Sequence, residues 1–177
     1  MRQLQFEDFK QVIAKLGNIT LFHYLTDTEK LILLKTCKIY EFNPDEKIVS
    51  QGETGACFFV ILSGTLNVTT FDTYSGKEVF LSVIGAGEVF GETGIFQNSK
   101  RTATVSAATT TEIICIERSD FFMFITKFTA AGFKMLMLLI DSLLRKLNDS
   151  NKELAFQRRE VLDQSALDQF LQTLRNE

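Results

Sequence analysis

The feature that most constrains the fold is a glycine-punctuated, β-branched region in the middle of the chain. Across residues 47–117, short runs rich in Val, Ile, Phe and Thr are separated by glycines. Turn signals at roughly eight- to twelve-residue spacing favour a sandwich or barrel over an alternating α/β fold. The clearest hairpin tip is Tyr74-Ser75-Gly76-Lys77. We therefore predict an antiparallel β jelly-roll, a double-stranded β-helix barrel.

Helical patterns flank this region on both sides, so the fold class is α+β. Phe6, Phe9 and Val12 begin an apolar face that ends at Gly17-Asn18. Thr26-x-x-Glu29 has the form of a capping box before a second helix at 28–37, and Asn43-Pro44-Asp45 predicts a turn. We expect an N-terminal helical segment at 1–40, the barrel at 41–118 and C-terminal helices at 119–177.

The C-terminal helices carry two informative patterns. Residues 121–140 have about the length of a membrane span, but Lys127, Gly132 and Lys134 interrupt them, so a hinge between two apolar helices is the better interpretation and no membrane contact is expected. Further on, apolar residues repeat every seven positions, at Ile140, Leu147, Leu154 and Val161. This repeat predicts a long helix with a packing seam, and a homodimer formed through that seam. Ser165-x-x-Asp168 predicts a separate last helix at 166–175.

Composition excludes several function classes. A net charge of −3 and a pI near 5.3 provide no basic stripe for nucleic acid. A cupin-type enzyme needs a cluster of metal-binding histidines, whereas the chain has a single histidine, His23; we expect no metal site and no enzyme. The three cysteines are far apart and indicate reduced core residues. The N-terminus lacks the apolar run of a signal peptide, so we expect a cytoplasmic protein.

One segment carries chemistry, namely Phe90-Gly91-Glu92-Thr93-Gly94-Ile95-Phe96 followed by Arg101-Thr102-Ala103-Thr104-Val105. Gly91 permits a backbone path that a side chain would block, and residues 92–96 can form a helical turn whose free N–H groups face an anion. Arg101 adds a planar fork of donors that matches phosphate oxygens. Glu92, beside a phosphate, must accept hydrogen bonds from a neutral group such as a ribose hydroxyl. Taken singly, Glu92 and Arg101 also fit a surface salt bridge.

This segment resembles the phosphate-binding cassette of the cyclic-nucleotide-binding domains, which include the catabolite activator protein and the regulatory subunits of cyclic-AMP-dependent kinase. The Glu92-to-Arg101 spacing matches the kinase form, and the similarity extends over most of the chain, through Gly52-Glu53 and Phe58-Phe59-Val60-Ile61-Leu62-Ser63-Gly64. The resemblance implies that cAMP or cGMP is the ligand, without a cofactor, with Arg101 on the cyclic phosphate and Glu92 on the 2′-hydroxyl. Asp45 stands where a glycine is usual, and Thr93-Gly94 replaces the commoner Leu-Ala.

The same resemblance suggests the rest of the pocket. Thr102 occupies a place where the family uses Thr for guanine or Ser for the phosphate, so it leaves the base open. Ser150 and Asn151 match the adenine contacts of the activator's dimer helix, which favours cAMP over cGMP. The predicted ligand-binding residues are Gly91, Glu92, Thr93, Gly94, Arg101, Thr102, Ala103, Val68, Leu81, Ser82, Ser150 and Asn151.

The resemblance also implies a regulatory module that signals through rearrangement of its C-terminal helix. Residues 155–177 are too few for a winged-helix DNA-binding domain, so we expect the module to act on an unidentified effector protein. The alternative is a scaffold of the same fold that binds proteins without any nucleotide. The two hypotheses differ in whether a nucleotide stabilises the fold.

Overall fold

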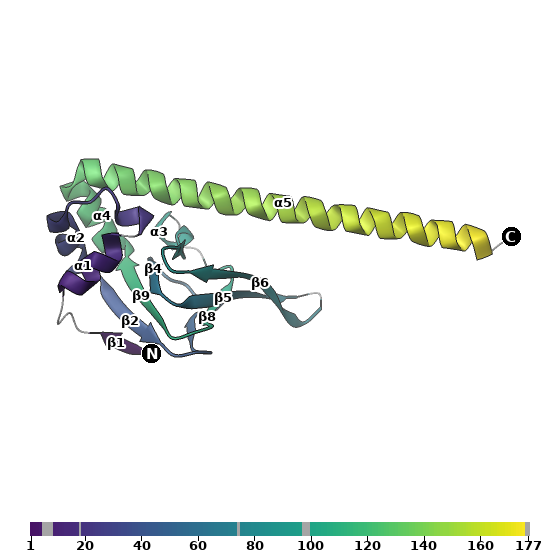
Figure 1. Cartoon of the computed structure of the whole chain (residues 1–177), viewed down its shortest axis with the longest axis horizontal. Helices are drawn as coiled ribbons and strands as arrows, with labels where there is room; N and C mark the ends of the chain where they lie inside the picture. The colour runs from purple at the N-terminus through teal and green to yellow at the C-terminus, as the bar shows by residue number, and fades with distance from the viewer. Residues whose placement is uncertain (5–8, 18, 74, 97–99, 176–177) are drawn as a thin grey trace. The chain divides into compact units, whose positions relative to one another are not determined.

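Two antiparallel sheets form the centre of the computed structural model, which describes residues 1–4, 9–17, 19–73, 75–96 and 100–175. Within these residues the larger sheet has the order β1–β2–β9–β4–β7 and the smaller sheet β3–β8–β5–β6 (Figure 1). The α+β jelly-roll class is confirmed. The strands are β1 (Arg2–Leu4), β2 (Lys38–Phe42), β3 (Lys47–Val49), β4 (Cys57–Ser63), β5 (Thr65–Asp72), β6 (Lys77–Gly85), β7 (Val89–Phe90), β8 (Thr104–Ala107) and β9 (Thr111–Glu117).

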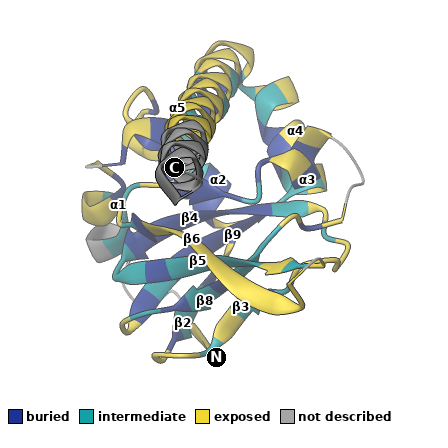
Figure 2. Cartoon of the chain, turned by 90° about the vertical axis from the view of Figure 1, so that its right-hand side faces the viewer, coloured by how far each residue is buried: buried dark blue, intermediate teal, exposed yellow. Residues whose placement is uncertain are grey.

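Strands β4 and β9 have apolar middle segments because both faces of the larger sheet are covered there. In β9, Ile113 and Cys115 pack against the smaller sheet, whereas Ile114 and Ile116 pack against the helices. Most of β4 is buried, whereas β6, at the edge of the smaller sheet, is exposed over residues 77–83 (Figure 2). The core between the sheets comprises Phe42, Val49, Phe59, Ile61, Leu66, Ile84, Phe90, Val105, Ala107, Ile113 and Cys115.

The helices enclose a second core on the outer face of the larger sheet. Figure 1 shows α1, α2 and α4 gathered on one side of the strands, and Leu16, Phe22, Leu33 and Phe121 are among the fully buried side chains of this second core. The helices are α1 (Phe9–Gly17), the 3₁₀ turn η1 (Thr20–Phe22), α2 (Asp27–Leu34), α3 (Thr93–Phe96), α4 (Arg118–Lys127) and α5 (Thr129–Arg175).

The N-terminal segment is helical only in part. Arg2–Leu4 form β1 by pairing with Ile39–Glu41 of β2, so the chain begins with a strand instead of a helix. Phe6 lies outside the described residues. The turn expected at Asn43-Pro44-Asp45 is present, and Asp45 has a φ of 68°, the left-handed region that glycine adopts more easily. This explains why a glycine is the usual residue there.

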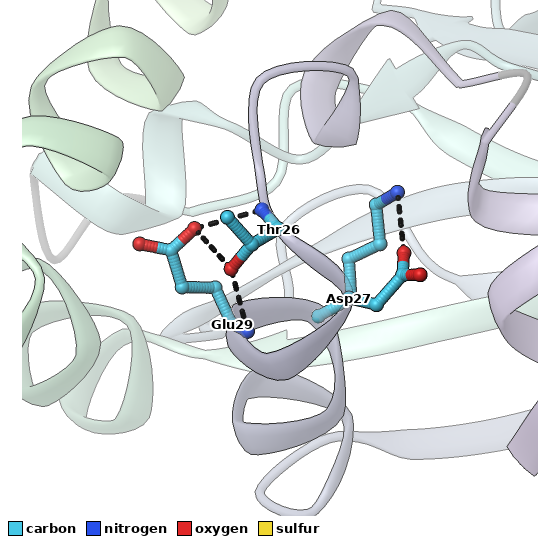
Figure 3. A network of polar contacts seen from close by, with 4 residues as sticks. Thr26, Asp27 and Glu29 are labelled. Carbon is cyan, nitrogen blue, oxygen red and sulfur yellow. Dashed lines mark hydrogen bonds and ion pairs between the residues drawn. The ribbon is translucent and has the colours of Figure 1, made fainter.

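The predicted capping box of α2 is confirmed (Figure 3). The Thr26 hydroxyl accepts from the Glu29 amide at 3.3 Å, and the Thr26 amide donates to Glu29 Oε2 at 2.8 Å. The predicted end at residue 37 is wrong, because α2 ends at Leu34 and Cys37 lies beyond it. The buried pair Leu33 and Leu34 completes the helix's contact with the core, and the chain then turns into β2 at Lys38.

A hinge separates α4 from α5, as the interrupted apolar run predicts. Phe128 leaves the helical conformation with φ −119° and ψ 66°. The two helices then approach closely, since a Cβ on Gly132 would lie 2.5 Å from Ile125 Cβ. None of the helices in the described ranges is long and apolar enough to cross a membrane.

The chain divides into two compact units, Met1–Leu139 and Ile140–Glu177. The second unit is helical as far as Arg175, because α5 continues through Ser165. The separate last helix expected at 166–175 is therefore wrong. The physical reason is that residues 155–175 contain neither glycine nor proline, so nothing interrupts the backbone ladder where Ser165 suggested a cap.

Candidate functional site

The backbone at Gly91 turns the chain from β7 into the short helix α3. Gly91 has a φ of +77°, and a Cβ there would lie 2.6 Å from Arg101 Nη1. A Cβ on Gly94, within α3, would lie 2.6 Å from the Gly55 carbonyl oxygen. Both glycines therefore occupy places where a side chain does not fit, which is the backbone path expected from the sequence.

The guanidinium of Arg101 is buried against β4 and β7. Its Nη1 donates to the Gly91 carbonyl at 3.1 Å, and its Nη2 donates to the Cys57 carbonyl at 2.9 Å. The same Nη2 lies 3.3 Å from Cys57 Sγ, and Cζ stands 5.5 Å from the centre of the Phe59 ring. Arg101 is only 7% exposed. These contacts fix the donor fork inside the protein instead of on its surface.

The backbone of Arg101 is held by the loop that precedes β4. The Arg101 amide donates to the Glu53 carbonyl at 2.7 Å, and the Gly52 amide donates to the Arg101 carbonyl at 2.9 Å. Thr54 and Lys100 form an isolated β-bridge beside them. Glu53 itself is anchored by the Ser50 amide at 3.0 Å, and this hydrogen bond lowers the pKa of its carboxyl. The Gly52-Glu53 motif thus positions the arginine.

Glu92 is also buried, with 4% of its surface exposed. The burial of both Glu92 and Arg101 rules out the surface salt bridge that each residue singly allowed. The expected helical turn after Glu92 is present, because the amides of Gly94 and Ile95 donate to the carbonyls of Gly91 and Glu92 at 3.0 Å each. These two N–H groups close the turn, and the expected contact of the earlier amides with an anion stays a prediction.

The structure brings some of the other predicted residues near the cassette. Ala103 is half-buried, and Thr93 and Thr102 are exposed. Val68 lies opposite Val105 of β8 and opposite Ser82 of β6, so these three residues form one row across the smaller sheet. The register shifts between Val68 and Thr69.

The remaining predicted residues are exposed. Leu81 is 53% exposed and Ser82 is also exposed. Ser150 and Asn151 lie in α5 within the second unit, and both are exposed. Their expected contact with adenine stays a prediction.

The sequence analysis missed three residues that contact or confine Arg101, namely Gly55, Cys57 and Phe59. Cys57 was expected in the core, but it is half-buried and its sulfur faces the guanidinium. A hydrogen bond from Cys115, assisted by the positive charge of Arg101, lowers the pKa of the Cys57 thiol to about 6, although burial opposes this shift. The alternation of β4 could have shown that Cys57 shares a face with Phe59 and Ile61, the face between the sheets.

Comparison with known proteins identifies the family. Residues 39–128, from β2 to the end of α4, match the model of the cyclic nucleotide-binding domain. The chain belongs to this family.

Two curated relatives and one solved structure illustrate the similarity. The cAMP-activated global transcriptional regulator CRP of Haemophilus influenzae is 31% identical over 121 residues, which are 68% of this chain and 52% of that protein. The cGMP-dependent protein kinase of Plasmodium berghei is 31% identical over 121 residues, again 68% of this chain but 13% of the kinase. The catabolite activator protein of Thermus thermophilus has a TM-score of 0.64 at 26% identity, covering 77% of this chain and 62% of that one. The chain thus spans about half of the first relative and a small part of the second.

Proposed function

We propose that this protein is a regulatory module that binds a cyclic nucleotide at the buried pair Arg101 and Glu92. The observation that carries the proposal is the buried guanidinium, which donates to two neutral carbonyls and shares its Nη2 with the sulfur of Cys57. A buried cation is costly unless an anion approaches it. A cyclic phosphate supplies such an anion, and the 2′-hydroxyl of its ribose can donate a hydrogen bond to the Glu92 carboxylate.

We propose that cAMP is the preferred nucleotide and that cGMP competes with it. Relatives named for each nucleotide match the chain at the same identity, so the preference rests on the resemblance of Ser150 and Asn151 to the adenine contacts of the activator's dimer helix. Thr102 is exposed beside Arg101 and is the residue that a guanine amino group would contact. Removal of this hydroxyl by Thr102→Ala should weaken cGMP more than cAMP if guanine is read here.

The role of Glu92 is tested with an analogue that lacks the hydroxyl. Wild-type protein should bind cAMP about tenfold more tightly than 2′-deoxy-cAMP, because a hydrogen bond to a charged group contributes about 1.5–3 kcal/mol. Glu92→Gln should weaken cAMP and bring the two affinities together. Glu41→Gln, a charge-matched change in β2 on the strand that pairs with β1, should keep the discrimination. Equal affinities in wild type would remove Glu92 from the ribose.

We also propose that α5 pairs two copies of the chain and moves when the nucleotide binds. Ile140, Leu147 and Leu154 repeat every seven residues and are 42%, 56% and 51% exposed. Leu144, which is 54% exposed, adds an apolar residue at the second position of the first heptad. The side chain of Val161 lies outside the described residues. In this proposal the module acts in the cytoplasm on a partner protein, without catalysis and without binding DNA.

A further inference from the structure

The thiol of Cys57 lies in a small cluster of charged and titratable groups at the end of β4. Arg101 Nη2 is 3.3 Å from its sulfur, and Cys115 of β9 hydrogen-bonds to it from the neighbouring strand. Glu117, directly opposite Cys57 in the sheet, is paired with Lys38 at 2.6 Å. Cys57 is half-buried, whereas Cys37 and Cys115 are buried. Cys57 is therefore the most accessible of the three thiols and the one beside a buried cation.

The hydrogen atoms of Arg101 Nη2 connect this thiol to the phosphate site. Nη2 carries two hydrogens, and it contacts both the carbonyl oxygen and the sulfur of Cys57. Both edges through which a guanidinium grips two oxygens, Nε–Nη2 and Nη1–Nη2, include Nη2. A bidentate phosphate must therefore displace one of the two contacts. The Cys57 carbonyl is fixed in the backbone of β4, whereas Sγ can rotate away about χ1, so the contact with the sulfur is the one released.

The geometry points to Cys57 as a modification site, a thiol that hydroperoxides oxidise to sulfenic acid in competition with the nucleotide for Arg101. This inference rests on the proposed function, because the competitor is the cyclic phosphate. The competition is reciprocal, so a nucleotide that protects Cys57 implies that oxidised Cys57 binds the nucleotide less tightly. The Cys57 thiolate and the phosphate are both anions, and both would bind the guanidinium of Arg101.

The chemistry uses a peroxide as the only oxidant. The thiolate sulfur attacks one peroxide oxygen, an S–O bond forms and the O–O bond breaks, so that hydrogen peroxide yields the sulfenic acid and hydroxide. The low pKa of the Cys57 thiol, about 6, favours the thiolate that reacts.

The test compares the reaction of each thiol in the full chain, without nucleotide. Wild type, Arg101→Ala, Arg101→Lys and the control Arg118→Ala are treated with iodoacetamide between pH 5 and 9, and each cysteine is followed by peptide mass mapping. At pH 7 Cys57 should react about fivefold more slowly in Arg101→Ala than in wild type. Arg101→Lys, which keeps the charge, should recover part of the rate. Arg118, whose guanidinium lies over Phe122, should have no effect. An unchanged pH profile in Arg101→Ala, in protein with a wild-type thermal transition, would overturn the proposal.

The second arm repeats the reaction with hydrogen peroxide and a dimedone trap, with and without saturating cAMP or cGMP. A nucleotide that binds by calorimetry should slow sulfenic acid formation at Cys57 at least fivefold, and protein alkylated at Cys57 should bind it more weakly. Binding without protection contradicts the competition with Arg101. If neither nucleotide binds, the proposed function fails, whereas the Arg101→Ala comparison still decides whether the guanidinium activates the thiol.

Discussion

At the scale of single residues, the position of the Arg101 guanidinium depends on two neighbouring glycines, which have no side chain. Gly55 and Gly91 stand on either side of the guanidinium, and a Cβ on each would lie 2.6 Å from a terminal nitrogen. The carbonyls of Gly91, just after β7, and of Cys57, in β4, orient the fork. Small residues and backbone acceptors thus preorganise the donor that a phosphate would meet, which lowers the cost of ordering it on binding.

This arrangement predicts a substitution that separates binding from stability. Gly55→Ala should push the guanidinium aside, because the added Cβ meets Nη2, Cζ and Nε of a long side chain that can swing away. Nucleotide affinity should fall at least tenfold, or about 1.4 kcal/mol, while the urea midpoint changes little. The control is Gly85→Ala, where the nearest atoms are 4.0 Å away. Unchanged affinity in Gly55→Ala, measured by titration, would show that the fork's position is not critical.

Residue patterns in the sequence reveal part of this site and miss the rest for a physical reason. Gly91, Glu92 and Arg101 are recognisable because one continuous segment carries them, and the chemistry of an anion site requires those residue types. Cys57 is 44 residues from Arg101 along the chain, and only the pairing of β4 with β7 and β9 brings the two together. No local pattern contains that contact, which is why Cys57 reads as an ordinary core cysteine.

At the scale of elements, local signals succeed where the cause is local. The capping box at Thr26 and Glu29 predicts the start of α2, because both hydrogen bonds lie within one turn. The strand β1 is missed because its three residues form a strand only by pairing with β2, about 37 positions further along the chain. Arg2 pairs with Glu41, and Leu4 pairs with Ile39. The end of α2 and the continuity of α5 are likewise decided by packing and by the absence of breakers.

The hinge between α4 and α5 gives a prediction for stability. Gly132→Ala should destabilise the protein by about 1–2 kcal/mol, because overpacking costs about 1–3 kcal/mol and the better helix propensity of alanine offsets only part of it. The clash involves Cα as well as Cβ of Ile125, so a rotamer change cannot relieve it. Gly17→Ala, at the end of α1 with no atom within 4 Å of the new Cβ, serves as control. Equal urea midpoints for the two variants would disprove the close contact.

At the scale of the whole molecule, the exposed apolar seam of α5 can be buried only against a partner chain. A buried leucine contributes about 1.5–3 kcal/mol relative to an exposed one, and a symmetric dimer buries each seam residue twice. Leu147→Glu should therefore convert a dimer to a monomer in sedimentation velocity. Asn148→Glu, an exposed change one residue off the seam, should leave the dimer intact. A wild-type chain that sediments as a monomer at all concentrations tested would contradict the pairing.

The central claim concerns the nucleotide itself, and calorimetric titration of cAMP and cGMP into wild type and Arg101→Ala tests it most directly. We predict tight binding of at least one nucleotide to wild type, with cAMP the tighter, and an affinity at least tenfold weaker in Arg101→Ala, because a charge-assisted pair contributes about 1.5–3 kcal/mol. The absence of heat with either nucleotide, in protein shown to be free of bound ligand and folded, would contradict the claim. That result would favour a scaffold that uses the same fold without a nucleotide.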